Sequence, residues 1–130
     1  MITKVFNESD YEGCSILKLS VTKEAFDITG TFEKPFELRN HSEWIESRLV
    51  EKHLFGMRKQ PVSIVYKHYD YVLLTNGYGA LRPWKLFEFK KVSPVLHPIH
   101  WMFSNGLTFY QKSGDYIIRL GRTIDSGNIA

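Results

Sequence analysis

The sequence predicts an α+β domain built on a curved or closed, mostly antiparallel sheet. Five segments have the composition or the period-two alternation of strands, and two short helices are expected in the first half of the chain. These elements do not alternate as strand–helix–strand units, which argues against a parallel sheet. A chain of 130 residues, 43% of them hydrophobic, is long enough for one core and too short for two. We therefore expect one domain over residues 14–124, a flexible arm over 1–13 and a C-terminal tail over 125–130.

The first two elements are a strand and a short helix. Residues 15–20, SILKLS, alternate in the manner of a strand. Thr22 can cap a helix over residues 23–29, KEAFDIT, because its hydroxyl can accept from a free N–H of the first turn. Gly30 then ends the helix as a residue in the left-handed conformation.

The stretch EKPFELRN, residues 33–40, predicts a second strand whose two faces differ in chemistry. At period two, Phe36 and Leu38 share one face, whereas Glu37 and Arg39 share the other. Two opposite charges therefore lie side by side on one face of the predicted strand.

A second helix is expected over residues 41–52, HSEWIESRLVEK. Asn40 can cap it, and Glu43 three residues later can reach back as in a capping box. Trp44 and Arg48 are four residues apart on this helix, so the indole and the guanidinium can lie together.

The remaining chain predicts one loop and three strands. Residues 54–65 are expected to form a loop with a basic tip at Arg58 and Lys59. The three strands span residues 69–76, 84–92 and 115–122. The first of them stops at NGYG, residues 76–79, where glycines and an asparagine suit a tight turn.

Charge and cysteine content limit the possible functions. The net charge of +3 favours an anionic partner but does not place it on the surface. A single cysteine excludes an internal disulfide and a cysteine-cluster zinc site, and Cys14 in the run CSILKL is expected to be buried. We find no secretory signal and no apolar stretch of about 20 residues. The expectation is a soluble, cytoplasmic protein with no membrane partner.

The charged residues of the second strand have two possible explanations. Glu37 and Arg39 can form a solvated surface pair, which contributes about 0–1 kcal/mol. Alternatively they line a polar pocket, with Lys34 nearby at the start of the strand and with Trp44 and Arg48 of the following helix on the same side. An arginine there offers a rigid fork to phosphate, a glutamate an acceptor or base, and a desolvated lysine a nucleophile or base. We favour the pocket.

Other chemistries find little support in the sequence. His97 and His100 are separated by Pro98 and have no Cys, Asp or Glu close by, so no metal or cofactor is expected. There is no nucleophile elbow, phosphate loop or dinucleotide fingerprint. The aromatic and basic residues of 66–71 and 82–85 suit contacts with single-stranded nucleic acid, or else belong to the core.

The order of these features resembles the ASCH domain, a member of the PUA-like superfamily. Its hallmark, G-x-K-x-x-E-x-R, is matched by Gly30 and then by Lys34, Glu37 and Arg39, with two extra residues after the glycine. The later stretches NGYG, WKLFEFKKV and GDYIIRLGR resemble the small, single-domain branch of this family from phages and bacteria.

The resemblance implies a curved β-barrel of about five to six strands with two or three flanking helices. It also implies binding of RNA or a nucleotide-like anion in a cleft between barrel and helices. Phosphate contacts, base stacking and close backbone approach are then expected from Lys34, Arg39, Trp44, Arg48, Asn76, Gly77, Tyr78 and Arg82.

Two alternatives stay open. The first is a metal-independent enzyme that acts on RNA or a modified nucleoside, as a ribonuclease or like an acetylcytidine amidohydrolase. Lys34 would then be nucleophile or base, and Glu37 or Glu88 the proton carrier, although the amidohydrolases of this family carry a hydroxyl residue where this chain has Glu37. The second is a phage-encoded interaction protein in the host cytoplasm, whose loop around Arg58 and Lys59 contacts a bacterial host protein.

Overall fold

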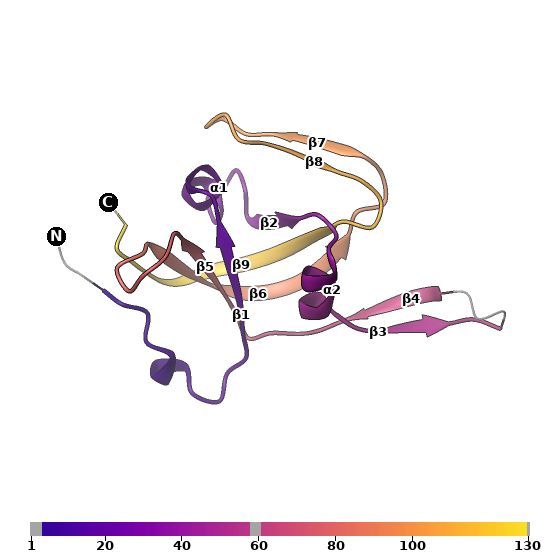
Figure 1. Ribbon diagram of the computed structural model, residues 1–130, viewed down its shortest axis with the longest axis horizontal. Coiled ribbons are helices and arrows are strands. Elements are labelled where there is room, and N and C mark those ends of the chain that lie inside the picture. Colours follow the sequence, from indigo (N-terminus) through magenta and orange to yellow (C-terminus); the bar gives the residue numbers. More distant parts are fainter. Residues whose placement is uncertain (1–3, 58–60, 130) are drawn as a thin grey trace.

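A five-stranded sheet curls into a half-barrel in the computed structural model, which describes residues 4–57 and 61–129 (Figure 1). The strand order is β1-β5-β6-β9-β2, and only the pair β1 and β5 is parallel. The strands are β1 (Ile16–Val21), β2 (Phe36–Arg39), β5 (Tyr71–Asn76), β6 (Trp84–Pro94) and β9 (Tyr116–Gly127). The predicted α+β class and the curved, antiparallel-rich sheet are confirmed.

Two short helices lie against this sheet. In α1 (Lys23–Ile28) the Thr22 hydroxyl accepts from the N–H of Ala25, so the predicted cap is confirmed. The helix α2 (Glu43–Leu49) is shorter than the predicted 41–52, because Val50 already begins a strand.

The predicted cap of α2 is wrong. Ser42 caps the helix, since its hydroxyl accepts from the N–H of Ile45 at 3.1 Å. The Asn40 amide instead donates to the Asp115 carboxylate at 2.9 Å and to the carbonyl of Tyr110 at 3.0 Å. Asn40 thus binds residues that are distant in the sequence and does not cap the helix, although the local sequence pattern predicted that it would.

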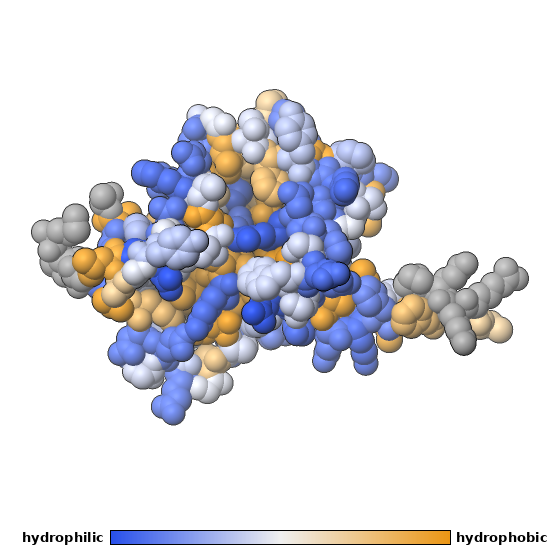
Figure 2. Space-filling view, viewed as in Figure 1, coloured by the Kyte–Doolittle hydropathy of each residue, from blue (hydrophilic) through white to orange (hydrophobic). Residues whose placement is uncertain are grey.

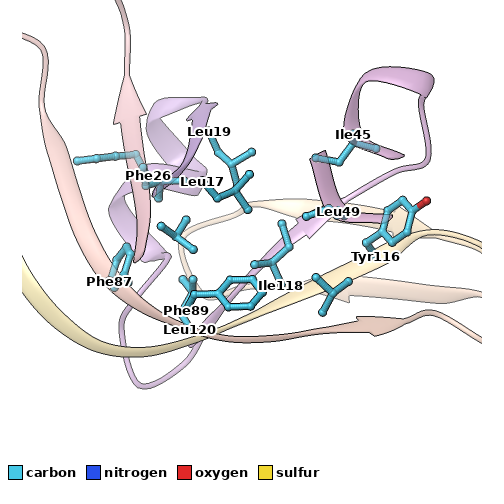
Figure 3. Close-up of a cluster of buried hydrophobic side chains, with 13 residues drawn as sticks. Leu17, Leu19, Phe26, Ile45, Leu49, Phe87, Phe89, Tyr116, Ile118 and Leu120 are labelled. Atoms are coloured by element: carbon cyan, nitrogen blue, oxygen red, sulfur yellow. The ribbon is translucent and has the colours of Figure 1, made fainter. Parts of the chain in front are cut away.

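The main core fills the space between the helices and one face of the sheet. Figure 3 shows Phe26 of α1 and Ile45 and Leu49 of α2 among leucines and aromatic rings from the strands. On β1, Leu17 and Leu19 belong to this cluster, as the predicted alternation requires. Burying such side chains contributes about 1.5–3 kcal/mol each.

Two hairpins extend from the sheet, and the sequence analysis predicted neither. One joins β3 (Val50–Phe55) to β4 (Pro61–Tyr66) and projects away from the rest of the fold, where a loop over 54–65 was expected (Figure 1). The other joins β7 (Ile99–Met102) to β8 (Thr108–Gln111) and covers β2. The basic tip predicted at Arg58 and Lys59 lies outside the described residues.

The chain ends also differ from the expected arm and tail. The 3-10 helix η1 (Glu8–Tyr11) and Phe6 pack on the second face of the sheet, where Phe6 meets the edge of the Trp84 ring. At the other end, β9 continues to Gly127. Cys14, expected to be buried, is exposed because it precedes β1 in a turn.

Neither helix in the described part of the chain is long and apolar enough to cross a membrane.

Candidate functional site

A pocket of about 750 Å³ opens where the two end strands of the half-barrel approach each other. One wall comes from the end of β1 and the first turn of α1, and the opposite wall from β2 and the start of α2. The turn after β5 and the start of β8 complete its lining. The pocket therefore lies between the curled sheet and the two helices.

Lys34 lies at the floor of this pocket and is only 1% exposed. The turn from Thr29 to Lys34 closes on itself, because Gly30 donates its N–H to the carbonyl of Lys34 at 2.8 Å. The Lys34 ammonium donates back to the Thr29 hydroxyl of this turn at 2.5 Å and to the Glu37 carboxylate of β2 at 3.2 Å. The Phe103 ring lies 5.8 Å from the ammonium nitrogen.

Burial lowers the pKa of Lys34 below its ordinary value of 10.5. The Glu37 carboxylate opposes this shift, and the positive charge of Arg39 adds to it. The lysine thus loses its proton more easily than a solvated lysine does.

The Glu37 carboxylate accepts four hydrogen bonds and is 3% exposed. Oε1 accepts from Lys34 and from the N–H of Leu38 at 3.1 Å. Oε2 accepts from Nε and Nη2 of Arg39 at 3.2 and 3.0 Å. A carboxylate has about four lone-pair positions, so all of them are occupied. Glu37 therefore serves as an internal counter-ion and has no free position for a ligand or a proton.

Arg39 bridges the two ends of the curled sheet. Its Nη2 atom also donates to the carbonyl of Ser20 on β1 at 2.8 Å, whereas Nη1 has no partner among residues 4–57 and 61–129. The side chain is 23% exposed. When Lys34 is protonated, two cations share one carboxylate, and the floor has an excess of one positive charge that reaches the pocket through Arg39.

Two aromatic side chains flank the mouth of the pocket. Trp44 of α2 is 49% exposed and Tyr78, in the turn after β5, is 95% exposed. Figure 2 shows strongly hydrophilic atoms at the centre of this face, between the positions of α1 and α2. Charge at the floor and exposed rings at the mouth are thus combined in one hollow.

Asp115, near the rim, fixes the connection from β2 to α2. Its buried carboxylate accepts from the N–H groups of His41 and Lys112 and from the Asn40 amide. Burial alone would raise the pKa of Asp115, but these hydrogen bonds and the charge of Lys112 outweigh it and lower the pKa. The ionised carboxylate thereby positions Asn40 and the adjoining start of α2.

The structure brings together part of the predicted site. Of the residues expected to contact nucleic acid, the pocket is lined by Lys34, Arg39, Trp44, Gly77 and Tyr78, and Glu37 lies with them. Arg48 is not among the lining residues; its guanidinium lies 5.1 Å from the Trp44 ring, so the predicted indole–guanidinium contact is confirmed.

Three further predicted residues, besides Arg48, lie outside the pocket lining. The Asn76 amide donates to the carbonyl of Val21 at 2.9 Å, which ties β5 to β1. Arg82 lines a separate, smaller pocket on the other face of the sheet. Glu88 pairs with Arg122 on the exposed surface of neighbouring strands. No hydrogen bond or ion pair in the described part of the chain joins Glu88 to Lys34.

Sequence reasoning missed the residues that complete the floor. Thr29 and the Ser20 carbonyl carried no signal, because their partners become neighbours only after folding. Phe103 and Phe109 come from the β7–β8 hairpin, which had a signal: Asn105-Gly106 between alternating residues is typical of a hairpin turn. Gly106 has φ 89°, as such a turn requires.

Comparisons of the chain with protein-family models, with curated proteins and with solved structures gave no match.

Proposed function

We propose that this chain is an ASCH-like domain of the PUA-like superfamily that binds RNA or a nucleotide-like anion in the pocket between barrel and helices. A cytoplasmic location is part of the same proposal. The observation that supports it most directly is the ion group formed by buried Lys34 and Glu37 with partly exposed Arg39, which has an excess positive charge beneath two exposed aromatic rings.

The two parts of the pocket suit the two parts of a nucleotide. Arginine offers planar, paired donors to a phosphate, and the low local dielectric strengthens that attraction. Exposed Trp and Tyr rings stack on bases without demanding a particular sequence. For the attraction of a phosphate, the position of the two cations Lys34 and Arg39 is then more important than the small net charge of +3 of the whole chain.

Fluorescence anisotropy with labelled single-stranded RNA tests this proposal. Trp44→Ala and Tyr78→Ala are each expected to weaken binding by about 1–3 kcal/mol, because each removes a stacking surface. Tyr110→Ala is the matched control, since Tyr110 is 68% exposed and its ring is not part of the pocket lining. Wild-type affinity should also fall as salt rises. Salt-independent binding, or equal losses for Tyr78→Ala and Tyr110→Ala, would contradict the proposal.

The lowered pKa of Lys34 favours a second candidate, metal-independent catalysis on RNA or a modified nucleoside such as acetylcytidine. Lys34 would be nucleophile or base. Neither Glu37, whose oxygens are occupied, nor the distant Glu88 supports the role of proton carrier, so a water or the substrate would carry the proton.

Incubation of the protein with RNA and with acetylcytidine in the presence of a chelator tests this candidate. Lys34→Ala should abolish product formation while Trp44→Ala only weakens substrate binding. Equal rates for wild type and Lys34→Ala would remove the lysine from the reaction.

A further inference from the structure

The charged groups that line the described pocket offer donors but no free carboxylate oxygen. Glu37 is the carboxylate of the floor, and its four lone-pair positions are filled from within the protein. Because Glu37 contacts only Nε and Nη2 of Arg39, the Nη1 donors of this arginine stay available to a ligand.

Two hydroxyl groups on the walls have the same donor character. Thr22 and Ser42 line the pocket, and each oxygen already accepts a main-chain N–H, from Ala25 and Ile45 respectively. Each hydroxyl can still donate its own hydrogen, and neither has a recorded acceptor in the described part of the chain. A ligand group seated between these walls thus meets N–H and O–H donors.

From this arrangement we infer that the floor binds a terminal phosphate monoester, at the end of an RNA or on a mononucleotide. This inference rests on the proposed function and identifies the chemical group of the ligand that contacts the pocket floor. A monoester offers three terminal oxygens, all acceptors, and carries up to two negative charges, whereas an internal phosphodiester offers two such oxygens and one charge. A protonated amino group has no acceptor, so it would leave the donors of Arg39, Thr22 and Ser42 unpaired.

The position of the two aromatic rings fits a ligand whose phosphate lies at the floor of the pocket and whose base lies at the mouth. Trp44 and Tyr78 lie at the mouth and are exposed, while Lys34 and Glu37 are buried beneath. With the phosphate at the floor, the base of the terminal nucleotide lies toward the rings, and the chain leaves the pocket through its mouth.

The test compares three short labelled RNAs of one sequence that carry a 5′ phosphate, a 3′ phosphate or hydroxyl groups at both ends. One of the phosphate-ended RNAs is expected to bind at least about tenfold more tightly than the hydroxyl-ended one, the effect of one charge-assisted hydrogen bond. Inorganic phosphate should compete with it. The preference should also grow between about pH 5 and pH 7, because the second pKa of a phosphate monoester is about 6.

Ser42→Asp is the most informative variant, because aspartate also caps helices but accepts only and is anionic. It should keep the fold and erase the preference for the phosphate-ended RNA. Ser113→Asp is the matched control: it adds the same charge at an exposed turn residue outside the pocket lining. Arg39→Lys, which keeps the charge and loses Nη1, should reduce the preference as well.

The two proposals fail differently. If all three RNAs bind equally and Trp44→Ala weakens each, the pocket binds RNA but the inference about terminal phosphate is wrong. If Ser42→Asp and Ser113→Asp retain the same preference, the phosphate lies elsewhere and the inference is likewise overturned. If wild type binds none of the RNAs at low salt, the proposed function fails and the inference with it.

Discussion

Arg39 on β2 donates to the main-chain carbonyl of Ser20 on β1 across 2.8 Å, and this contact joins the two end strands of the curled sheet. The same guanidinium forms a two-donor contact with Glu37. One side chain thus fixes the separation of the pocket walls and delivers positive charge to the pocket. We therefore expect a substitution of Arg39 to change the stability of the fold and the proposed ligand binding together.

Replacement of Arg39 by lysine is expected to lower the free energy of unfolding by about 1.5–3 kcal/mol. Lysine keeps the charge but cannot reach Glu37 and Ser20 with a planar fork. Urea unfolding measures the loss. Arg122→Lys is the control, because Arg122 forms an exposed pair with Glu88 and its replacement should change stability by less than about 0.5 kcal/mol. Similar values for both variants would show that the bridge contributes nothing.

Glu37→Gln should destabilise the fold more strongly, by about 3–5 kcal/mol. The substitution keeps the size of the side chain but leaves Lys34 and Arg39 without their shared anion inside the protein. Glu88→Gln, on the exposed surface, is the matched substitution and should have little effect. A small loss for Glu37→Gln would mean that water enters the pocket floor and solvates both cations.

The pH dependence of stability should report the burial of Lys34. Its pKa is lowered in the folded protein, so between that value and 10.5 the unfolded chain binds a proton that the folded chain does not. The stability of wild type should therefore rise with pH across this window, relative to Lys34→Met. Unfolding free energies of both proteins between about pH 7 and pH 10 give the difference. A difference that is constant or falls with pH would contradict the lowered pKa.

Asp115→Asn should cost about 1.5–3 kcal/mol near neutral pH, because it removes the charge that accepts three donors. The pKa of Asp115 is lowered, so its contribution is complete above 3.8 and is lost as the pH falls from 3.8 toward the folded value. The difference in unfolding free energy between wild type and Asp115→Asn should consequently become smaller in acid. Asp10→Asn, at an exposed position, serves as the control in the same acid titration.

Gly30→Ala tests the turn that places Lys34. A Cβ at Gly30 would lie 2.3 Å from the Phe87 ring, whereas at Gly106 it would meet nothing within 4 Å, and the φ angles are 90° and 89°. Both alanine variants bear a left-handed backbone cost of about 1–2 kcal/mol. Gly30→Ala alone adds overpacking of about 1–3 kcal/mol, which calorimetry of the two variants separates.

Local pattern was sufficient for several elements. Period-two alternation placed Phe36 and Leu38 on one face of β2, and both belong to one apolar cluster with residues of the β7–β8 hairpin. The cap at Thr22 also followed from neighbours in sequence. These features depend on dihedral preferences and on residues one to four positions apart, which a single sequence records.

Local pattern failed where a distant residue competed for a side chain. Asn40 has the chemistry of a helix cap, yet Asp115, far along the chain, binds its amide and leaves the cap to Ser42. Likewise, the Arg48 guanidinium stacks on the Trp44 ring, as their spacing predicted. Arg48 is nevertheless absent from the pocket lining, where it was also predicted to lie.

The amino-acid sequence alone determined which residues are charged, which alternate and where helices can begin, and it thereby placed Lys34, Glu37 and Arg39 close together. Only the tertiary structure decided that Thr29, Ser20 and the β7–β8 hairpin surround them. The curl of the sheet brings β1 to β2, and this approach removes water from the ions. Desolvation and long-range hydrogen bonding depend on the whole fold, so no short stretch of sequence encodes them.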